Sequence, residues 1–160
     1  MNKTDPPKTF GVFKPVDHTV ISFRSDADMH TAMSSLTEQG FPVSSLVCYT
    51  PAEMMIQVDA ELKTASPLAS FGYELDLIKA HRELAESGCS FLMVYAPDDK
   101  QAQRVAAVVR ASKAVTAQHY GTFMIEEIME VQPGGGGAHQ TSGNEPPDNE
   151  DSDDAPISPR

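Results

Sequence analysis

The sequence has no tryptophan, only two cysteines, and far fewer basic than acidic residues, with 12 lysines and arginines against 23 aspartates and glutamates. The net charge of −11 would repel nucleic-acid phosphates and an anionic membrane surface, so we expect neither as a partner. No apolar run approaches the about 20 residues of a membrane span, and the N-terminus lacks the apolar segment of a signal peptide. We therefore expect a cytoplasmic protein with one globular domain.

The few cysteines and histidines argue against a metal or redox site. Cys48 and Cys89 lie in apolar, strand-like surroundings, so we expect buried free thiols rather than a disulfide, although paired strands could bring them close together. The five histidines show no metal-ligand spacing, and no cysteine pair has the spacing of a zinc site. The sequence thus predicts no metal and no cofactor.

The two ends of the chain differ in composition from its middle. Residues 1–17 are polar and proline-rich, which predicts an extended N-terminal arm with Phe10, Val12 and Phe13 as its apolar anchors. Residues 133–160 have almost no large apolar side chains and carry six acidic residues and one arginine. Such a segment buries too little surface to offset the entropy of ordering. It is predicted to be a disordered acidic tail.

Between the ends, hydrophobic periodicity predicts alternating strands and helices. Alternation of the kind seen in Thr19, Ile21 and Phe23 is typical of a strand. Ser25 and Asp98 are predicted to be N-caps of amphipathic helices, the first ending at Gly40. Strands are predicted over residues 18–24, 45–50, 89–95 and 114–120, with a further extended segment over 123–129. This order is βαβ, a helical insert, and βαβ again.

That order predicts an α+β domain over residues 18–132 with a ferredoxin-like antiparallel sheet and a helical insert at 51–88. Pro67 divides the insert into a helix from Pro51 to Thr64 and a second helix, capped by Ser66, that runs to Ser87. The second helix has two nearly opposite apolar faces. One comprises Leu68, Phe71, Gly72, Leu75, Ile78 and Ala85, and the other comprises Ala69, Tyr73, Leu77, Ala80 and Leu84.

Two apolar faces on one helix predict a second contact surface. We expect this surface to bind another subunit in a homo-oligomer, and the alternative is packing against the Pro51–Thr64 helix of the same chain. The sheet face away from the two flanking helices is also too apolar to meet water. Either the insert or a second sheet in a dimer must cover that face.

Three runs, YTPAEM, ASPLASFGYELDLIKAH and AQHYGTFMIEEI, resemble a group of uncharacterised bacterial proteins. That group is loosely similar to the ferredoxin-like domains of general-stress-protein-like families, and the resemblance covers about residues 18–130. It implies a stress-related or regulatory role and carries no catalytic signature. The charged middle of this chain departs from the glycine-rich middle of those relatives, which argues against a membrane-linked role.

Two groups of residues are candidates for a ligand site. Glu74 and His81 are two helical turns apart on one polar strip, and Arg82 follows directly. His119 and Tyr120 precede Gly121, with Glu126 and Glu127 downstream. A histidine and a carboxylate can act as acid and base if they meet in a pocket. Adjacent strand residues point to opposite faces, so His119 and Tyr120 cannot both face the same glutamate.

These features lead to three hypotheses. The first is a non-enzymatic, cytoplasmic, oligomerising module with a stress-related or regulatory role. The second is a small-ligand sensor that binds its ligand at a subunit interface. The third is a small α+β barrel enzyme that uses His81 or His119. The sequence favours the first, and it predicts a homo-oligomer with a small molecule as the alternative partner.

Overall fold

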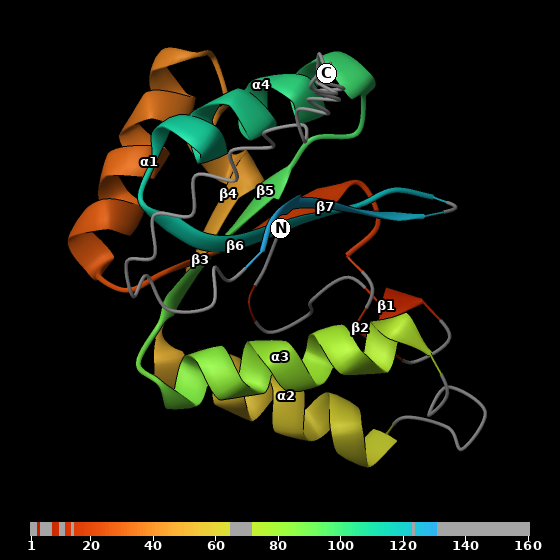
Figure 1. Cartoon of the computed structure of the whole chain (residues 1–160). Helices are drawn as coiled ribbons and strands as arrows, with labels where there is room; N and C mark the ends of the chain where they lie inside the picture. Colours follow the sequence, from red (N-terminus) through yellow and green to blue (C-terminus); the bar gives the residue numbers. More distant parts are fainter. Residues whose placement is uncertain are drawn as a thin grey trace, which may run out of the picture.

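The computed structural model describes residues 3, 8–9, 12–13, 15–64, 72–122 and 124–130 (Figure 1). The predicted acidic tail at 133–160 lies outside these residues, as does most of the predicted arm.

The centre of the molecule is a five-stranded, wholly antiparallel sheet with the order β4-β5-β3-β6-β7. Its strands are β3 (His18–Phe23), β4 (Leu46–Tyr49), β5 (Ser90–Tyr95), β6 (Ala114–Tyr120) and β7 (Ile125–Met129). Each helical crossover joins two strands that flank a third, and β7 adds an edge strand beside β6. The α+β class is confirmed, and the strand order is compatible with the predicted ferredoxin-like fold.

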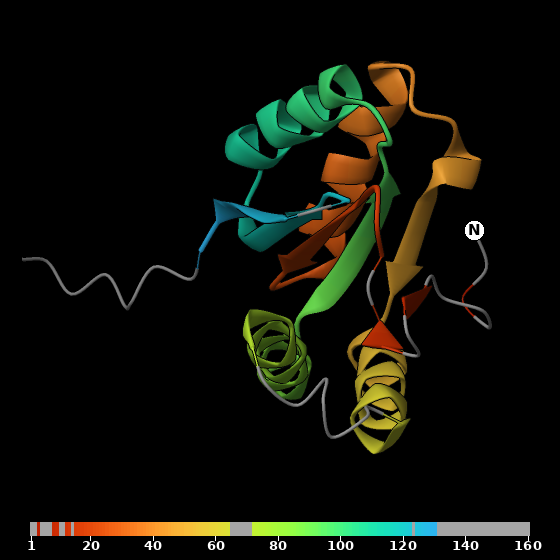
Figure 2. The ribbon, with the colours of Figure 1, turned by 90° about the vertical axis from the view of Figure 1, so that its right-hand side faces the viewer.

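Helices cover both faces of this sheet and make three layers (Figures 1 and 2). On one face lie α1 (Asp26–Glu38) and α4 (Asp99–Ala111). On the other lie α2 (Pro51–Thr64) and α3 (Tyr73–Glu86), which form the predicted insert. A short 3-10 turn, η1 (Val43–Ser45), leads into β4.

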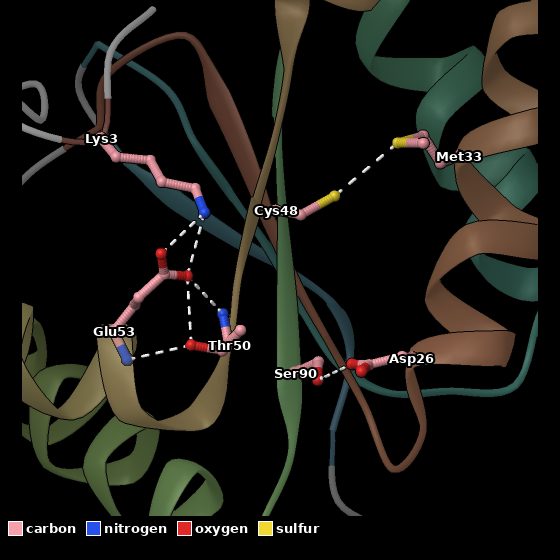
Figure 3. Close-up of polar contacts among 7 residues, drawn as sticks. All are labelled: Lys3, Asp26, Met33, Cys48, Thr50, Glu53 and Ser90. Atoms are coloured by element: carbon pink, nitrogen blue, oxygen red, sulfur yellow. Dashed lines mark hydrogen bonds and ion pairs between the residues drawn. The ribbon is translucent and has the colours of Figure 1, made fainter.

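Local sequence explains where three of the helices begin. The Ser25 hydroxyl accepts a hydrogen bond from the Asp28 amide at 3.2 Å, and the Asp98 carboxylate accepts one from the Gln101 amide at 2.9 Å. Both predicted N-caps are therefore confirmed. A third cap, at Thr50, follows the same chemistry and was not predicted. Its hydroxyl accepts from the Glu53 amide at 3.2 Å, while the Glu53 carboxylate accepts from the Thr50 amide at 2.9 Å (Figure 3).

The alternation of side chains along the strands divides the core in two. On β5, Leu92 and Val94 face α1 and α4, whereas Phe91 and Met93 face α2 and α3. All four are at most 1% exposed. The apolar character of this strand, which predicted an interior position, follows from burial on both faces.

The second insert helix differs from the prediction at its start. α3 begins at Tyr73, and Gly72 before it has a φ of +134°, which is not helical. The helix predicted to run through Gly72 is therefore wrong at that residue. Glycine adopts such positive φ values without the steric cost that other residues meet. The predicted cap at Ser66 and the turn at Pro67 lie outside the described residues.

Both apolar faces of α3 contribute buried residues within the chain, although Ala80 of the second face is exposed. Leu77, Ile78 and Ala85 are buried in the core between the insert and the sheet, and α2 lies alongside α3 (Figure 2). Of the two alternatives for the second face, packing against the Pro51–Thr64 helix is the one observed. The insert also covers the sheet face that would otherwise meet water. Homo-oligomerisation stays a prediction.

Part of the N-terminal arm lies against the insert. β1 (Lys8–Thr9) and β2 (Val12–Phe13) pair with each other, and β2 contacts α2. The ammonium of Lys3 lies 2.9 Å from both oxygens of Glu53 and 5.7 Å from the centre of the Tyr49 ring (Figure 3). The Glu53 carboxylate, which hydrogen-bonds the capping residue Thr50, therefore also binds Lys3.

Both cysteines are free, as predicted. The register places Leu92, not Cys89, opposite Cys48. The Cys48 thiol instead lies 3.7 Å from the Met33 sulfur, and Ser90 hydrogen-bonds Asp26 on the same face of the sheet (Figure 3). Within the described ranges, no helix combines the length and the apolar character needed to cross a membrane.

Candidate functional site

The hairpin of β6 and β7 carries polar residues on both of its faces. His119 is paired with Glu126, and Gln118 is paired with Glu127. Neighbouring strand residues point to opposite faces. The first pair therefore faces α4, and the second faces the insert. As strand alternation predicts, His119 and Tyr120 point to opposite faces, and the register sets Glu126 opposite His119.

A cavity of about 240 Å³ lies between α4 and this hairpin. From α4, the lining residues follow the helical spacing i, i+3, i+4, i+7 and i+11, so they form one stripe along the helix. The lining consists of Asp99, Ala102, Gln103, Ala106 and Arg110 from α4, His119 from β6, and Glu126 and Ile128 from β7. Drug-sized ligands usually occupy about 300–1,000 Å³. This cavity suits a smaller molecule.

His119 is held in place by its neighbour on β3. Its Nδ1 lies 3.0 Å from the Thr19 hydroxyl, which fixes the orientation of the ring. Partial burial lowers the pKa of His119, while the negative charge of Glu126 acts in the opposite direction, together with smaller contributions from Asp17 and Asp99. The ring is therefore biased toward the neutral form, in which it can donate one hydrogen bond and accept another.

The charged residues of the cavity have no partners within the described part of the chain. Asp99, Arg110 and Glu126 make no side-chain hydrogen bond or ion pair there. All three side chains are exposed to solvent, whereas Arg104, elsewhere on α4, donates to the Gln39 carbonyl at 3.0 Å. The cavity thus presents one cation and two carboxylates that remain available to a ligand.

The opposite face of the hairpin carries a buried chain of hydrogen bonds. The Gln118 amide nitrogen donates to Glu127 at 2.7 Å, and the Gln118 carbonyl oxygen lies 3.3 Å from Nε2 of His81. His81 is 1% exposed, and its ring meets the Phe91 ring edge-on at 5.8 Å between centroids. Since Gln118 offers an oxygen, Nε2 of His81 must carry the proton.

Burial lowers the pKa of His81, because the charged imidazolium loses its hydration. The hydrogen bond to Gln118 and the charge of Glu127 offset this effect in part. Its Nδ1 has no hydrogen-bond partner among the described residues. His81 is therefore biased toward the neutral form and is buried away from solvent.

Arg82 joins the two insert helices. Its Nε donates to Asp59 of α2 at 2.9 Å, and its guanidinium also pairs with Glu86 one turn along α3. The predicted pair of His81 and Arg82 is therefore not brought together in one site. Glu74 lies on α3, but its side chain is outside the described residues.

Tyr120 also lies apart from the cavity. Its side chain is 3% exposed and belongs to the core between the sheet and the insert. Its carbonyl accepts a hydrogen bond from the Asp17 amide at 2.7 Å. Of the four candidate ligand-binding residues whose side chains the structure describes, His119 alone lines this cavity.

Two further features of the described residues bear on the choice of site. No group of three histidine, cysteine or acidic side chains in the described ranges is arranged to hold a metal ion. A second, shallower depression of about 570 Å³ is lined by α4 and the end of α1, and includes Gln39, Lys100 and Arg104. Arg104 is occupied there by the Gln39 carbonyl and by the Phe41 ring at 5.1 Å.

Comparison of the chain with protein-family models, curated proteins and solved structures found no match. The resemblance to bacterial stress-protein-like domains therefore stays a prediction. The proposed function therefore rests on the geometry of the chain itself.

Sequence reasoning missed Arg110, Asp99 and the Gln118 link to His81. The signal for the first two was available, since Asp99 and Arg110 lie on the same stripe of one helix. Knowing that this stripe faces His119 requires the packing of α4 over the hairpin. Gln118 carries no charge, and its contact with His81 joins two elements that are distant in sequence.

Proposed function

We propose that this protein is a non-enzymatic binding module with a ferredoxin-like core, and that it binds a small polar molecule in the cavity between α4 and the β6–β7 hairpin. The single observation that carries the proposal is the set of unpartnered charges around His119. Asp99, Arg110 and Glu126 line one cavity without hydrogen bonds or ion pairs to the described residues. Convergent polar groups in a concave site are the usual mark of a ligand site.

The lining of this cavity favours binding over attack by a hydroxyl, thiol or amine nucleophile. Its described residues include no serine, cysteine or lysine, and its reactive groups are two carboxylates and one imidazole. His119 and Glu126 could exchange protons with a ligand, yet His81, the other histidine considered for an enzyme, is buried in the core. A stress-related or regulatory role, as the resemblance implies, is consistent with a module that responds to a small ligand.

The proposal can be tested by native mass spectrometry of the freshly purified full chain. We expect a bound species of low mass that the variant Ala102→Phe no longer carries, because the new ring fills the cavity. The matched control is Ala111→Phe, which places the same ring at an exposed position of α4 outside the lining residues. Retention of the species by Ala102→Phe, or its absence from all three proteins, would contradict the proposal. The same spectra report whether the chain forms an oligomer.

A further inference from the structure

The charges of the cavity are separated along its length. Arg110 follows Asp99 by eleven positions on α4, which corresponds to about 16 Å along the helix axis at 1.5 Å per residue. Only Ser112 and Lys113 link α4 to β6, so β6 runs back along the helix. Its end therefore lies beside the start of α4. The Coulombic effect of Asp99 on His119 is consistent with this arrangement.

The two ends of the cavity consequently differ in sign. Asp99, Glu126 and His119 gather at one end, where Glu126 is the cross-strand partner of His119. Arg110 stands toward the other end, beyond Ala106. A carboxylate pair favours a cationic group, and a guanidinium favours a carboxylate through paired hydrogen bonds.

The helix dipole explains only part of this pattern. An acidic residue in the first turn and a basic residue in the last turn stabilise a helix, and α4 has Asp99 and Arg110 at those places. Glu126 belongs to β7, where no helix dipole acts on it in this way. Its position opposite His119 adds a carboxylate to the end that already holds Asp99. The cavity therefore has a polarity that α4 alone would not produce.

We propose that the ligand is a small, extended zwitterion, with its ammonium group at Asp99 and Glu126 and its carboxylate at Arg110. This inference rests on the proposed function and names the class of ligand for that site. The ammonium group donates to the two carboxylates, and the carboxylate accepts from the guanidinium. The apolar stretch between the two groups lies along Ala102, Ala106 and Ile128. A linear amino acid with its charges at opposite ends fits this description, whereas the charges of an α-amino acid are too close together.

The test is an NMR titration of the full chain that follows the ring resonances of His119, assigned with the variant His119→Gln. The probe is 6-aminohexanoate, and the matched compounds are hexanoate, hexylammonium and glycine. We expect 6-aminohexanoate to shift the His119 resonances and to leave those of buried His81 unchanged. Hexanoate and hexylammonium each lack one charge, and the two charges of glycine are too close together. Each should bind at least about tenfold more weakly, because it cannot form all the charge-assisted hydrogen bonds.

Variants at each end of the cavity complete the test. Arg110→Gln and Glu126→Gln should each weaken binding of 6-aminohexanoate at least about tenfold. Lys100→Gln and Glu130→Gln change the net charge equally, from exposed positions outside the lining, and should leave affinity within about twofold.

The possible results separate the ligand class from the binding function. Equal binding by hexanoate or hexylammonium, or full affinity in Arg110→Gln, would overturn the zwitterion. If no probe binds while the purified chain carries a mass that Ala102→Phe removes, the zwitterion is wrong and the proposed function stands. If no probe binds and no such mass exists, both are wrong.

Discussion

The two faces of the β6–β7 hairpin present the same kinds of residue in opposite circumstances. On the insert face, His81, Gln118 and Glu127 form a buried chain of hydrogen bonds. On the α4 face, His119 and Glu126 line a cavity, and Glu126 has no partner in the described part of the chain. Glu126 and Glu127 are neighbours in sequence, and alternation along β7 places them on opposite faces of the hairpin.

The difference shows why a histidine beside a glutamate is an ambiguous signal. A buried polar group is costly unless it is hydrogen-bonded, so the chain must supply partners itself. Gln118 does so for Nε2 of His81, although Nδ1 of the same ring has no partner among the described residues. A polar group beside a cavity can take its partners from water or from a ligand. The insert face therefore contributes to stability, whereas the α4 face retains unpaired charges that a ligand can use.

The largest expected effect comes from removing the buried histidine. His81→Ala should lower the free energy of unfolding by about 3 kcal/mol, because it leaves a void beside Phe91 and an unsatisfied Gln118. His119→Ala should cost about 1 kcal/mol or less, since the ring is partly exposed. Urea denaturation monitored by circular dichroism measures both. His30→Ala, on the exposed side of α1, is the control. Equal losses for His81 and His119 would contradict the division between the two faces.

The pH dependence of stability should also come mainly from the insert face. Burial lowers the pKa of His81 in the folded chain, so the unfolded chain binds the proton more readily. The contribution of the neutral ring is present in full above the unfolded pKa of about 6.5 and is lost as pH falls through the folded pKa. Urea midpoints measured between neutral pH and mildly acidic pH should therefore decline.

The variant His81→Ala provides the control for this pH dependence. His18 and His119 also have lowered pKa values, so some decline should remain. A decline just as steep in His81→Ala as in the original chain would assign the effect to those other groups.

The two glutamates of β7 offer a matched pair of substitutions. Glu127→Gln removes the charge from the acceptor of the Gln118 hydrogen bond, and should lower stability by about 1–2 kcal/mol. Glu126→Gln makes the same chemical change one residue away and should stay within about 0.5 kcal/mol of the original chain, because it breaks no hydrogen bond in the described structure. Urea denaturation under identical conditions compares them. The reverse order would place the structural glutamate on the α4 face.

Much of the fold could be predicted because its signals are local. The N-caps at Ser25 and Asp98 and the boundaries of α2 and β6 follow from capping chemistry and periodicity, which require no knowledge of the rest of the chain. The start of α3 could not be predicted in this way. Periodicity counts Gly72 as a small helical residue, whereas its backbone adopts a positive φ and precedes the helix.

The candidate site was predictable only where alternation alone placed its residues. Alternation correctly separates His119 from Tyr120, whereas the pairing of His119 with Glu126 depends on the register of the hairpin. Arg110 depends on how α4 lies over the hairpin, and Arg82 depends on which side of α3 meets α2. Both positions depend on tertiary packing, so the sequence pattern of a single helix or strand could not predict them.

Arg82 provides the smallest expected effect and the last check on the comparison. Arg82 lies on α3 next to His81, but its ion pair with Asp59 joins side chains that are 40% and 45% exposed. Water and salt screen such pairs, and ordering two long side chains costs entropy. Arg82→Gln should therefore shift the urea midpoint less than Glu127→Gln does, and added salt should remove most of that shift.

A double-mutant cycle with Asp59→Asn isolates the ion pair from other effects of the substitution. If Arg82→Gln proves more damaging than Glu127→Gln, the insert is held by its outer ion pairs rather than by its buried chain of hydrogen bonds. The contrast between the two hairpin faces would then no longer explain where the stability of the molecule resides. A small, salt-sensitive effect would instead assign that role to burial, which is what distinguishes His81 from His119.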